Sequence, residues 1–149
     1  MIKHIWIDAD SCPLLVRNYV VKYSAKLQIK VTFVANKKIT CEENFPFEMI
    51  VCAQTKDAAD NYIIENAESE DLVITRDIVF ADKLVDKNIL CINDRGTVFT
   101  KEIIKERLST RDFDLQLAEM GLVKHHNEGY DKTKFAKFAN CFDRVIHQN

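Results

Sequence analysis

The 149-residue sequence predicts a single α/β domain built around a mostly parallel five-stranded sheet, with further helices at its C-terminus. Short apolar runs alternate with segments of helical periodicity through residues 2–92, which favours right-handed βαβ crossovers and parallel strands. Only three glycines and two prolines are present, and no stretch has the composition of a linker. The chain length suits one compact domain, so we expect residues 1–149 to form one unit.

Five runs predict strands because they are short, apolar and rich in β-branched residues. Residues 36–47, which are polar and contain Pro46, predict the connection between the second and third of these strands. The expected strands cover residues 2–7, 29–34, 48–52, 71–75 and 89–92.

The intervening segments predict helices. Asp10 and Ser11 are suitable N-cap residues for the first helix, and Pro13 fits its first turn. Further helices are expected at residues 57–67, 78–87, 101–108, 111–121 and 131–146. The last helix carries an apolar stripe at helical spacing, which we interpret as core packing rather than a platform for stacking bases; it comprises Phe135, Phe138, Phe142 and Val145.

The composition excludes several classes of protein. The glycines allow neither a GxGxxG fingerprint nor a P-loop. A net charge of −2 gives no overall basic field for nucleic acid, although a local basic patch or a bound cation could still attract it. No apolar run reaches the roughly 18 residues of a membrane span. The five cysteines lack CxxC spacing and no signal peptide is visible, so we expect a reduced, cytoplasmic protein without a membrane partner.

Acidic residues follow three of the predicted strands. Asp8 and Asp10 come after the first strand, Asp57 and Asp60 after the third, and Asp77 after the fourth. Parallel strands gather their carboxyl ends along one edge of the sheet, where α/β proteins bind ligands. Because carboxylates held together repel one another unless a cation or protons intervene, this pattern predicts a divalent-metal site.

The residue types indicate which metal to expect. Oxygen ligands without a convergent histidine suit Mg²⁺ or Mn²⁺ rather than Zn²⁺. Thr75 can add a hydroxyl at the same edge, and Asp82 either completes the group or is a plain surface acid. Each carboxylate also has a structural interpretation as a helix cap, and this alternative is strongest for Asp10 and Asp57.

Three sequence blocks carry a resemblance to a known family. They read Asp8-Ala9-Asp10-Ser11-Cys12-Pro13, Asp57-Ala58-Ala59-Asp60-Asn61-Tyr62-Ile63 and Asp71-Leu72-Val73-Ile74-Thr75-Arg76-Asp77. The sequence resembles the bacterial YaiI/YqxD family, which is grouped by resemblance with PIN-like domains. That resemblance implies a three-layer α/β/α sandwich and metal-dependent hydrolysis of phosphodiester bonds, with RNA as the expected substrate. It also implies catalytic roles for Asp8, Asp60 and Asp77, which match the acid positions of PIN-like nucleases.

Two other functions remain open at the sequence level. Asp8-x-Asp10 after a first strand is also similar to haloacid-dehalogenase-like phosphatases, in which the first aspartate is a nucleophile. Alternatively, the acids only cap helices and the protein is a non-catalytic module that binds RNA or protein. In either nucleic-acid interpretation, Arg76 and Arg111 are candidate phosphate contacts, with Arg95, Lys101 and Arg107 as further basic residues.

Overall fold

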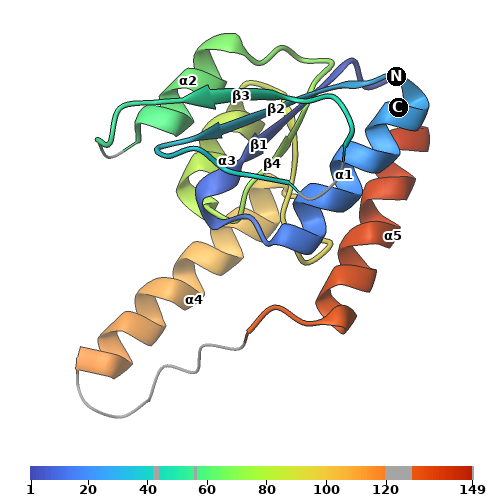
Figure 1. The fold of residues 1–149 in the computed structure, drawn as a ribbon. Helices are drawn as coiled ribbons and strands as arrows, with labels where there is room; N and C mark the ends of the chain where they lie inside the picture. The colour runs from blue at the N-terminus through green and yellow to red at the C-terminus, as the bar shows by residue number, and fades with distance from the viewer. Residues whose placement is uncertain (42–43, 56, 120–128, 149) are drawn as a thin grey trace.

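The computed structural model describes residues 1–41, 44–55, 57–119 and 129–148 (Figure 1). Within helix α4, side chains at 112–113 and 116–119 are not described. The strands are β1 (His4–Asp8), β2 (Lys30–Ala35), β3 (Glu48–Val51), β4 (Leu72–Ile74) and β5 (Leu90–Ile92). The helices are the 3₁₀ turn η1 (Ala9–Ser11), α1 (Leu14–Leu27), α2 (Ala58–Asn66), α3 (Ile78–Asp86), α4 (Lys101–Glu119) and α5 (Lys132–Gln148).

The five strands form one sheet in the order β3-β2-β1-β4-β5, and every neighbouring pair is parallel. The β1 residue Ile7 lies opposite Ile74 in β4, which in turn lies opposite Ile92 in β5. The predicted α/β class and parallel sheet are therefore confirmed. This register aligns the carboxyl ends of β1, β4 and β5, so the residues that follow them emerge at one edge.

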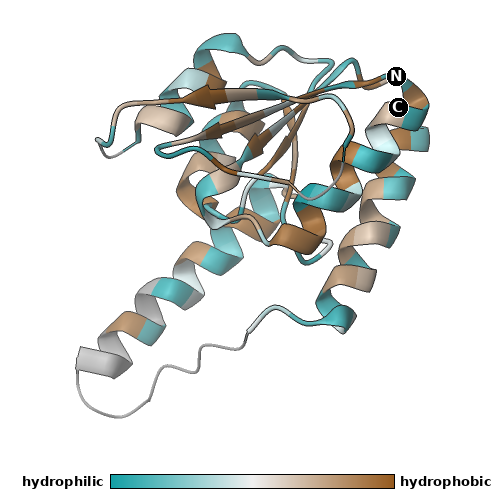
Figure 2. Cartoon of the chain, in the orientation of Figure 1, coloured by the Kyte–Doolittle hydropathy of each residue, from teal (hydrophilic) through white to brown (hydrophobic). Residues whose placement is uncertain are grey.

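Two helical layers enclose the sheet. On one face, α1 and α5 pack through Val20, Phe138 and Phe142. On the other face, α2, α3 and the start of α4 pack against Trp6 and Val73. Figure 2 shows hydrophobic residues concentrated in the strands and on the inner sides of the helices. The three-layer sandwich is confirmed, and so is the interpretation of the stripe on α5 as core packing.

The helix boundaries differ from expectation at two places. The segments predicted as separate helices at 101–108 and 111–121 are one helix, α4, through Glu119; the predicted end at 121 lies outside the described residues. Thr110 lies within α4, and its hydroxyl donates to the Glu106 carbonyl at 3.0 Å, a contact that a continuous helix accommodates. The first α-helix begins at Leu14, after η1, so Asp10 and Ser11 do not cap it and Pro13 occupies the N-cap position.

No helix in the described ranges is long and apolar enough to cross a membrane. All five cysteines are free thiols.

Candidate functional site

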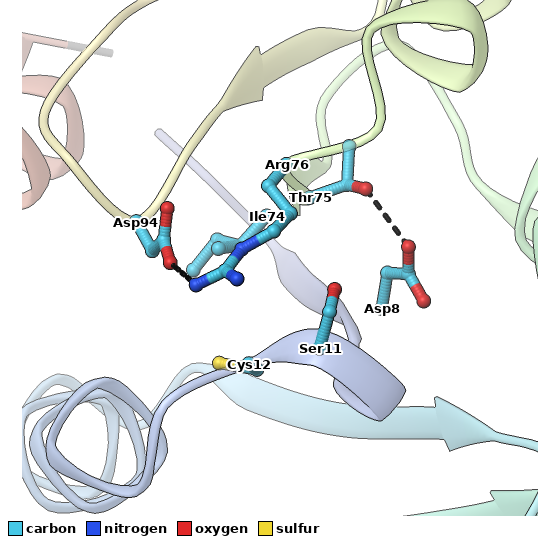
Figure 3. Close-up of a pocket in the computed structure, with 7 residues that line it drawn as sticks. All are labelled: Asp8, Ser11, Cys12, Ile74, Thr75, Arg76 and Asp94. Carbon is cyan, nitrogen blue, oxygen red and sulfur yellow. Dashed lines mark hydrogen bonds and ion pairs between the residues drawn. The ribbon is translucent and has the colours of Figure 1, made fainter. Parts of the chain in front are cut away.

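The carboxyl ends of β1 and β4 bring Asp8 and Thr75 into direct contact (Figure 3). The Thr75 hydroxyl donates a hydrogen bond of 2.8 Å to Asp8 Oδ2, and its oxygen accepts one of 3.1 Å from the Asp77 backbone N–H. Thr75 is only 2% exposed. This buried hydroxyl therefore fixes both the Asp8 carboxyl and the start of α3.

Asp77 caps helix α3. Its Oδ1 accepts hydrogen bonds from the backbone N–H groups of Val79 and Phe80, at 3.0 and 3.2 Å. The structural interpretation of Asp77 is thus confirmed. A cap through Oδ1 still leaves the carboxylate a second oxygen with which to meet a cation, so the two roles are compatible.

Two of the site acids, Asp8 and Asp60, have raised pKa values. Burial raises the pKa of Asp8 to about 6, the Thr75 hydrogen bond opposes this, and the charges of Asp10 and Asp77 add to it. Burial also raises the pKa of Asp60 to about 7, with further contributions from Asp8, Asp77 and Asp57. Residues from β1, α2 and the β4–α3 turn therefore share one negative field, although long stretches of sequence separate them.

Asp10 and Asp57 occupy the margins of this group. Both oxygens of Asp10 accept from the Asn36 backbone N–H, at 3.1 and 2.9 Å, which ties η1 to the end of β2. Asp57 precedes α2 with a left-handed backbone (φ 66°) and makes no side-chain cap. An aspartate tolerates this conformation better than most residues.

A small cavity adjoins Asp8. It has a volume of about 10 Å³, which is space for roughly one water molecule, and its lining includes Ser11, Cys12 and Arg76 (Figure 3). Arg76 lines the cavity and forms an ion pair with Asp94, whose side chain is 5% exposed.

The remaining candidates lie apart from this group. Arg111 is exposed on α4 and does not line the cavity. Asp82 pairs with Lys101 on the surface at 2.7 Å, so the interpretation as a surface acid fits it. Burial raises the pKa of the Cys12 thiol, which favours its role as a packing residue over a reactive one.

Asp94 is the site residue that sequence reasoning passed over. It follows strand β5 by two positions and therefore shows the strand-end signal that singled out the other acids. Its carbonyl accepts a hydrogen bond of 2.6 Å from the Tyr130 hydroxyl, which links the segment before α5 to this edge. The Asn93-to-Gly96 stretch has the residue types of a turn, and only the fold places it beside Arg76.

The donor set suits a hard divalent cation that keeps part of its water shell. In the part of the chain that the structure describes, no three His, Cys, Asp or Glu side chains are grouped closely enough to enclose a metal ion. Magnesium does not require such an enclosure, because it is usually held by one or two carboxylates, several waters and substrate phosphate. The charges of Asp8, Asp60 and Asp77 interact, so these residues can supply the one or two carboxylates that magnesium needs.

We expect Thr75→Val to raise the pKa of Asp8 further above its ordinary value, because the lost hydroxyl stabilises the charged carboxylate. Carboxyl-carbon NMR titration measures this value directly. Thr110→Val, which removes a hydroxyl from the surface of α4, is the matched control. An Asp8 titration that is identical in both variants would mean that Thr75 does not tune the carboxyl.

Comparison with known proteins places the chain in a family. The family model described as "Uncharacterized BCR, YaiI/YqxD family" matches residues 6–148. A UPF0178 protein of Treponema denticola is 42% identical over 142 residues, covering 95% of this chain and 90% of the relative. UPF0178 proteins of Treponema pallidum and Geobacter metallireducens are 42% and 39% identical, covering 94% and 95% of this chain and 79% and 92% of their own lengths. No solved structure matches the chain. The sequence, from the first strand to the last helix, thus belongs to the YaiI/YqxD family.

Proposed function

We propose that this protein is a nuclease that hydrolyses phosphodiester bonds, with RNA as the substrate, at a Mg²⁺ or Mn²⁺ site formed by Asp8, Asp60 and Asp77. The observation that carries the proposal is the pKa pattern: burial raises the pKa of Asp8 to about 6 and that of Asp60 to about 7, with the charges of neighbouring aspartates, Asp77 among them, adding to both shifts. Titratable groups perturbed in this way, gathered at a ligand-binding edge, are typical of functional sites.

Each residue has a definite task in this proposal. Asp8 and Asp60 provide the negative field at the centre, and Thr75 orients Asp8 through its hydroxyl. Asp77 contributes its second oxygen while capping α3. Asp10 and Asp57 add charge at the margins. A bound divalent cation would supply neutralisation of charge on the phosphate and a water of lowered pKa.

The arginines supply the substrate contacts. Arg76 lines the same cavity as Asp8, and its guanidinium is directed toward Asp94 (Figure 3). The guanidinium nitrogens that do not bond Asp94 can donate to a phosphate oxygen. Arg111 is exposed on α4 and would contact phosphate farther from the acids. Their positive charge is needed at this edge because the chain as a whole carries −2.

The alternative phosphatase chemistry requires Asp10 to act as a general acid. Its two oxygens are instead engaged by the Asn36 backbone N–H, which favours a structural task for this carboxylate. The structure therefore gives no specific support to a nucleophilic role for Asp8.

A paired hydrolysis assay tests the proposal. We expect labelled RNA to be cleaved with Mn²⁺, and Asp8→Asn to lower the rate by about 100-fold or more, as for other groups that stabilise a transition state electrostatically. Asp82→Asn, at an acid paired with Lys101 outside the group, should keep its activity. Turnover of p-nitrophenyl phosphate through an acyl-phosphate on Asp8 would instead establish the phosphatase. RNA binding without either reaction would establish the non-catalytic module.

A further inference from the structure

The order of strands arranges charged residues in a row along the carboxyl edge. Strands β1, β4 and β5 are consecutive in the sheet, and the turn at residues 93–97 follows β5. Neighbouring strands are about 4.8 Å apart, so the β5 turn lies roughly 10 Å from the end of β1. The acids of the proposed metal site, which we call the acid group (Asp8, Asp60 and Asp77), lie toward the β1 and β4 end of this row, and arginines gather at its β5 end.

Three arginines meet around the turn after β5; we call them the arginine turn, and they are Arg76, Arg95 and Arg107. Arg76 reaches this turn through its ion pair with Asp94. The Arg107 Nη2 donates to Thr97 Oγ1 at 3.0 Å. Arg95 is exposed within the turn itself. The three residues come from β4–α3, the β5 turn and α4, so the cluster is a product of the fold.

The backbone that carries the arginine turn is rigid. The Asn93 side chain, from a residue only 4% exposed, accepts from the N–H groups of Arg95 at 3.0 Å and Thr97 at 2.9 Å. Gly96 has φ +84°, and a Cβ there would come within 2.5 Å of the Lys137 carbonyl oxygen. Only glycine satisfies both conditions, so the turn is held against α5.

Aromatic packing also fixes Arg107. Its guanidinium lies over the ring of Phe99 at 5.9 Å from the centroid, and Phe99 is 4% exposed. The acid of the turn, Asp94, is buried and paired with Arg76, so the exposed charges that the turn and Arg107 present are those of Arg95 and Arg107. A fixed, outward-facing group of arginines beside a site for a phosphodiester fits further phosphates of the same strand.

We infer that a single strand of RNA lies along the carboxyl edge, with its scissile phosphate at the acid group and the next one or two phosphates on Arg95 and Arg107. The inference rests on the proposed function for the place of cleavage, whereas the phosphate contacts themselves do not depend on catalysis. The roughly 10 Å between the two ends of the row corresponds to one or two nucleotides of an extended strand. Mononucleotide-sized esters would therefore miss the arginine turn.

A salt-dependent binding experiment tests the contacts. In the Asp8→Asn background, which the proposed function makes inactive, an eight-nucleotide single-stranded RNA is titrated at several salt concentrations. We expect Arg95→Gln and Arg107→Gln each to reduce the log–log salt slope by about 0.7, the value for one phosphate contact to a single strand. Arg107→Lys should retain the slope because it keeps the charge. Arg144→Gln removes an exposed arginine near the C-terminus of α5 and should change nothing. Slopes that do not differ from those of Arg144→Gln would overturn the inference.

A kinetic experiment separates this inference from the proposed function. In the otherwise unchanged protein with Mn²⁺, Arg95→Gln and Arg107→Gln should raise KM for the eight-nucleotide RNA about 5- to 10-fold. They should leave hydrolysis of bis(p-nitrophenyl) phosphate unaltered. Equal losses on both substrates would contradict the inference while leaving the nuclease proposal intact. Normal salt slopes for binding, with no cleavage of either substrate, would contradict the nuclease proposal alone.

Discussion

Replacing Asp60 by asparagine should stabilise the fold at pH 8 when no divalent cation is present. The wild-type carboxyl is charged at that pH although burial and the charges of Asp8, Asp77 and Asp57 oppose its ionisation. The raised pKa corresponds to a cost of roughly 4 kcal/mol for the charged carboxylate, and solvent screening at this half-buried group removes about half of it. Replacing the carboxylate by an amide should therefore raise the unfolding free energy by roughly 2 kcal/mol. Loss of an acid from the first turn of α2 subtracts about 0.3–1 kcal/mol. The net gain of about 1 kcal/mol corresponds to roughly 3 °C in Tm.

The pH dependence of this gain has a defined direction. Because the folded pKa of about 7 exceeds the ordinary 3.8, the folded state holds a proton that the unfolded state has released. The unfolding free energy of the wild type therefore falls, relative to Asp60→Asn, as the pH rises from about 4 through about 7. Above that range the difference is constant, and below pH 4 it vanishes.

Divalent cation should reverse the ranking of the two proteins. Mg²⁺ or Mn²⁺ that binds only the folded state stabilises the wild type by RT ln(1 + [L]/Kd), whereas Asp60→Asn loses most of that gain. Thermal unfolding with EDTA and with millimolar Mn²⁺ measures both effects. Asp82→Asn should show neither, because Asp82 is paired with Lys101 at the surface. If Asp60→Asn is destabilised at pH 8 in EDTA, the site acids do not repel one another as described.

Phe142→Ala should cost about 3–5 kcal/mol of unfolding free energy, the usual result for truncating a fully buried aromatic residue. Phe142 is 0% exposed, and its ring lies 5.8 Å from those of both Tyr19 and Tyr23 and 5.7 Å from that of Phe138. These contacts join α5 to α1 and to the sheet, so the loss would loosen the whole layer.

Urea unfolding of Phe142→Ala and Phe135→Ala measures this difference. Phe135 lies at one end of the same stripe, where it is only partly buried and contacts Tyr19. Its truncation to alanine should therefore cost about 1–2 kcal/mol of unfolding free energy. Equal costs for the two variants, or a loss below 1 kcal/mol for Phe142→Ala, would show that α5 is not part of the core.

Periodicity determined most of what the sequence could predict about the fold. Alternation of short apolar runs with amphipathic helices identified all five strands, because burial of both sheet faces leaves a strong pattern. The stripe through Phe138 and Phe142 was assigned correctly for the same reason. The break expected before residue 111 was wrong: α4 runs from Lys101 through Glu119, and the Thr110 hydroxyl donates to the Glu106 carbonyl within it.

The site was less accessible from sequence. Strand ends located Asp8 and Asp77, since a parallel sheet collects them at one edge. The buried hydrogen bond from Thr75 to Asp8 spans 67 residues and depends on β1 pairing with β4, so only its donor could be anticipated. Asp94 carries the same strand-end signal two positions after β5 and could have been found by it. The arginine turn depends on how α4 and α5 pack against the β5 turn, and no local pattern records that packing.

Paramagnetic broadening by Mn²⁺ tests most directly whether the acids share one cation. Substoichiometric Mn²⁺ added to isotope-labelled protein should broaden the backbone signals of Asp8, Asp60 and Asp77 together, before those of the surface acids Asp82 and Asp86. Asp8→Asn should abolish the common broadening at all three positions. Broadening that begins at Asp82 and Asp86, or that affects only one of the three site acids, would contradict a shared metal site.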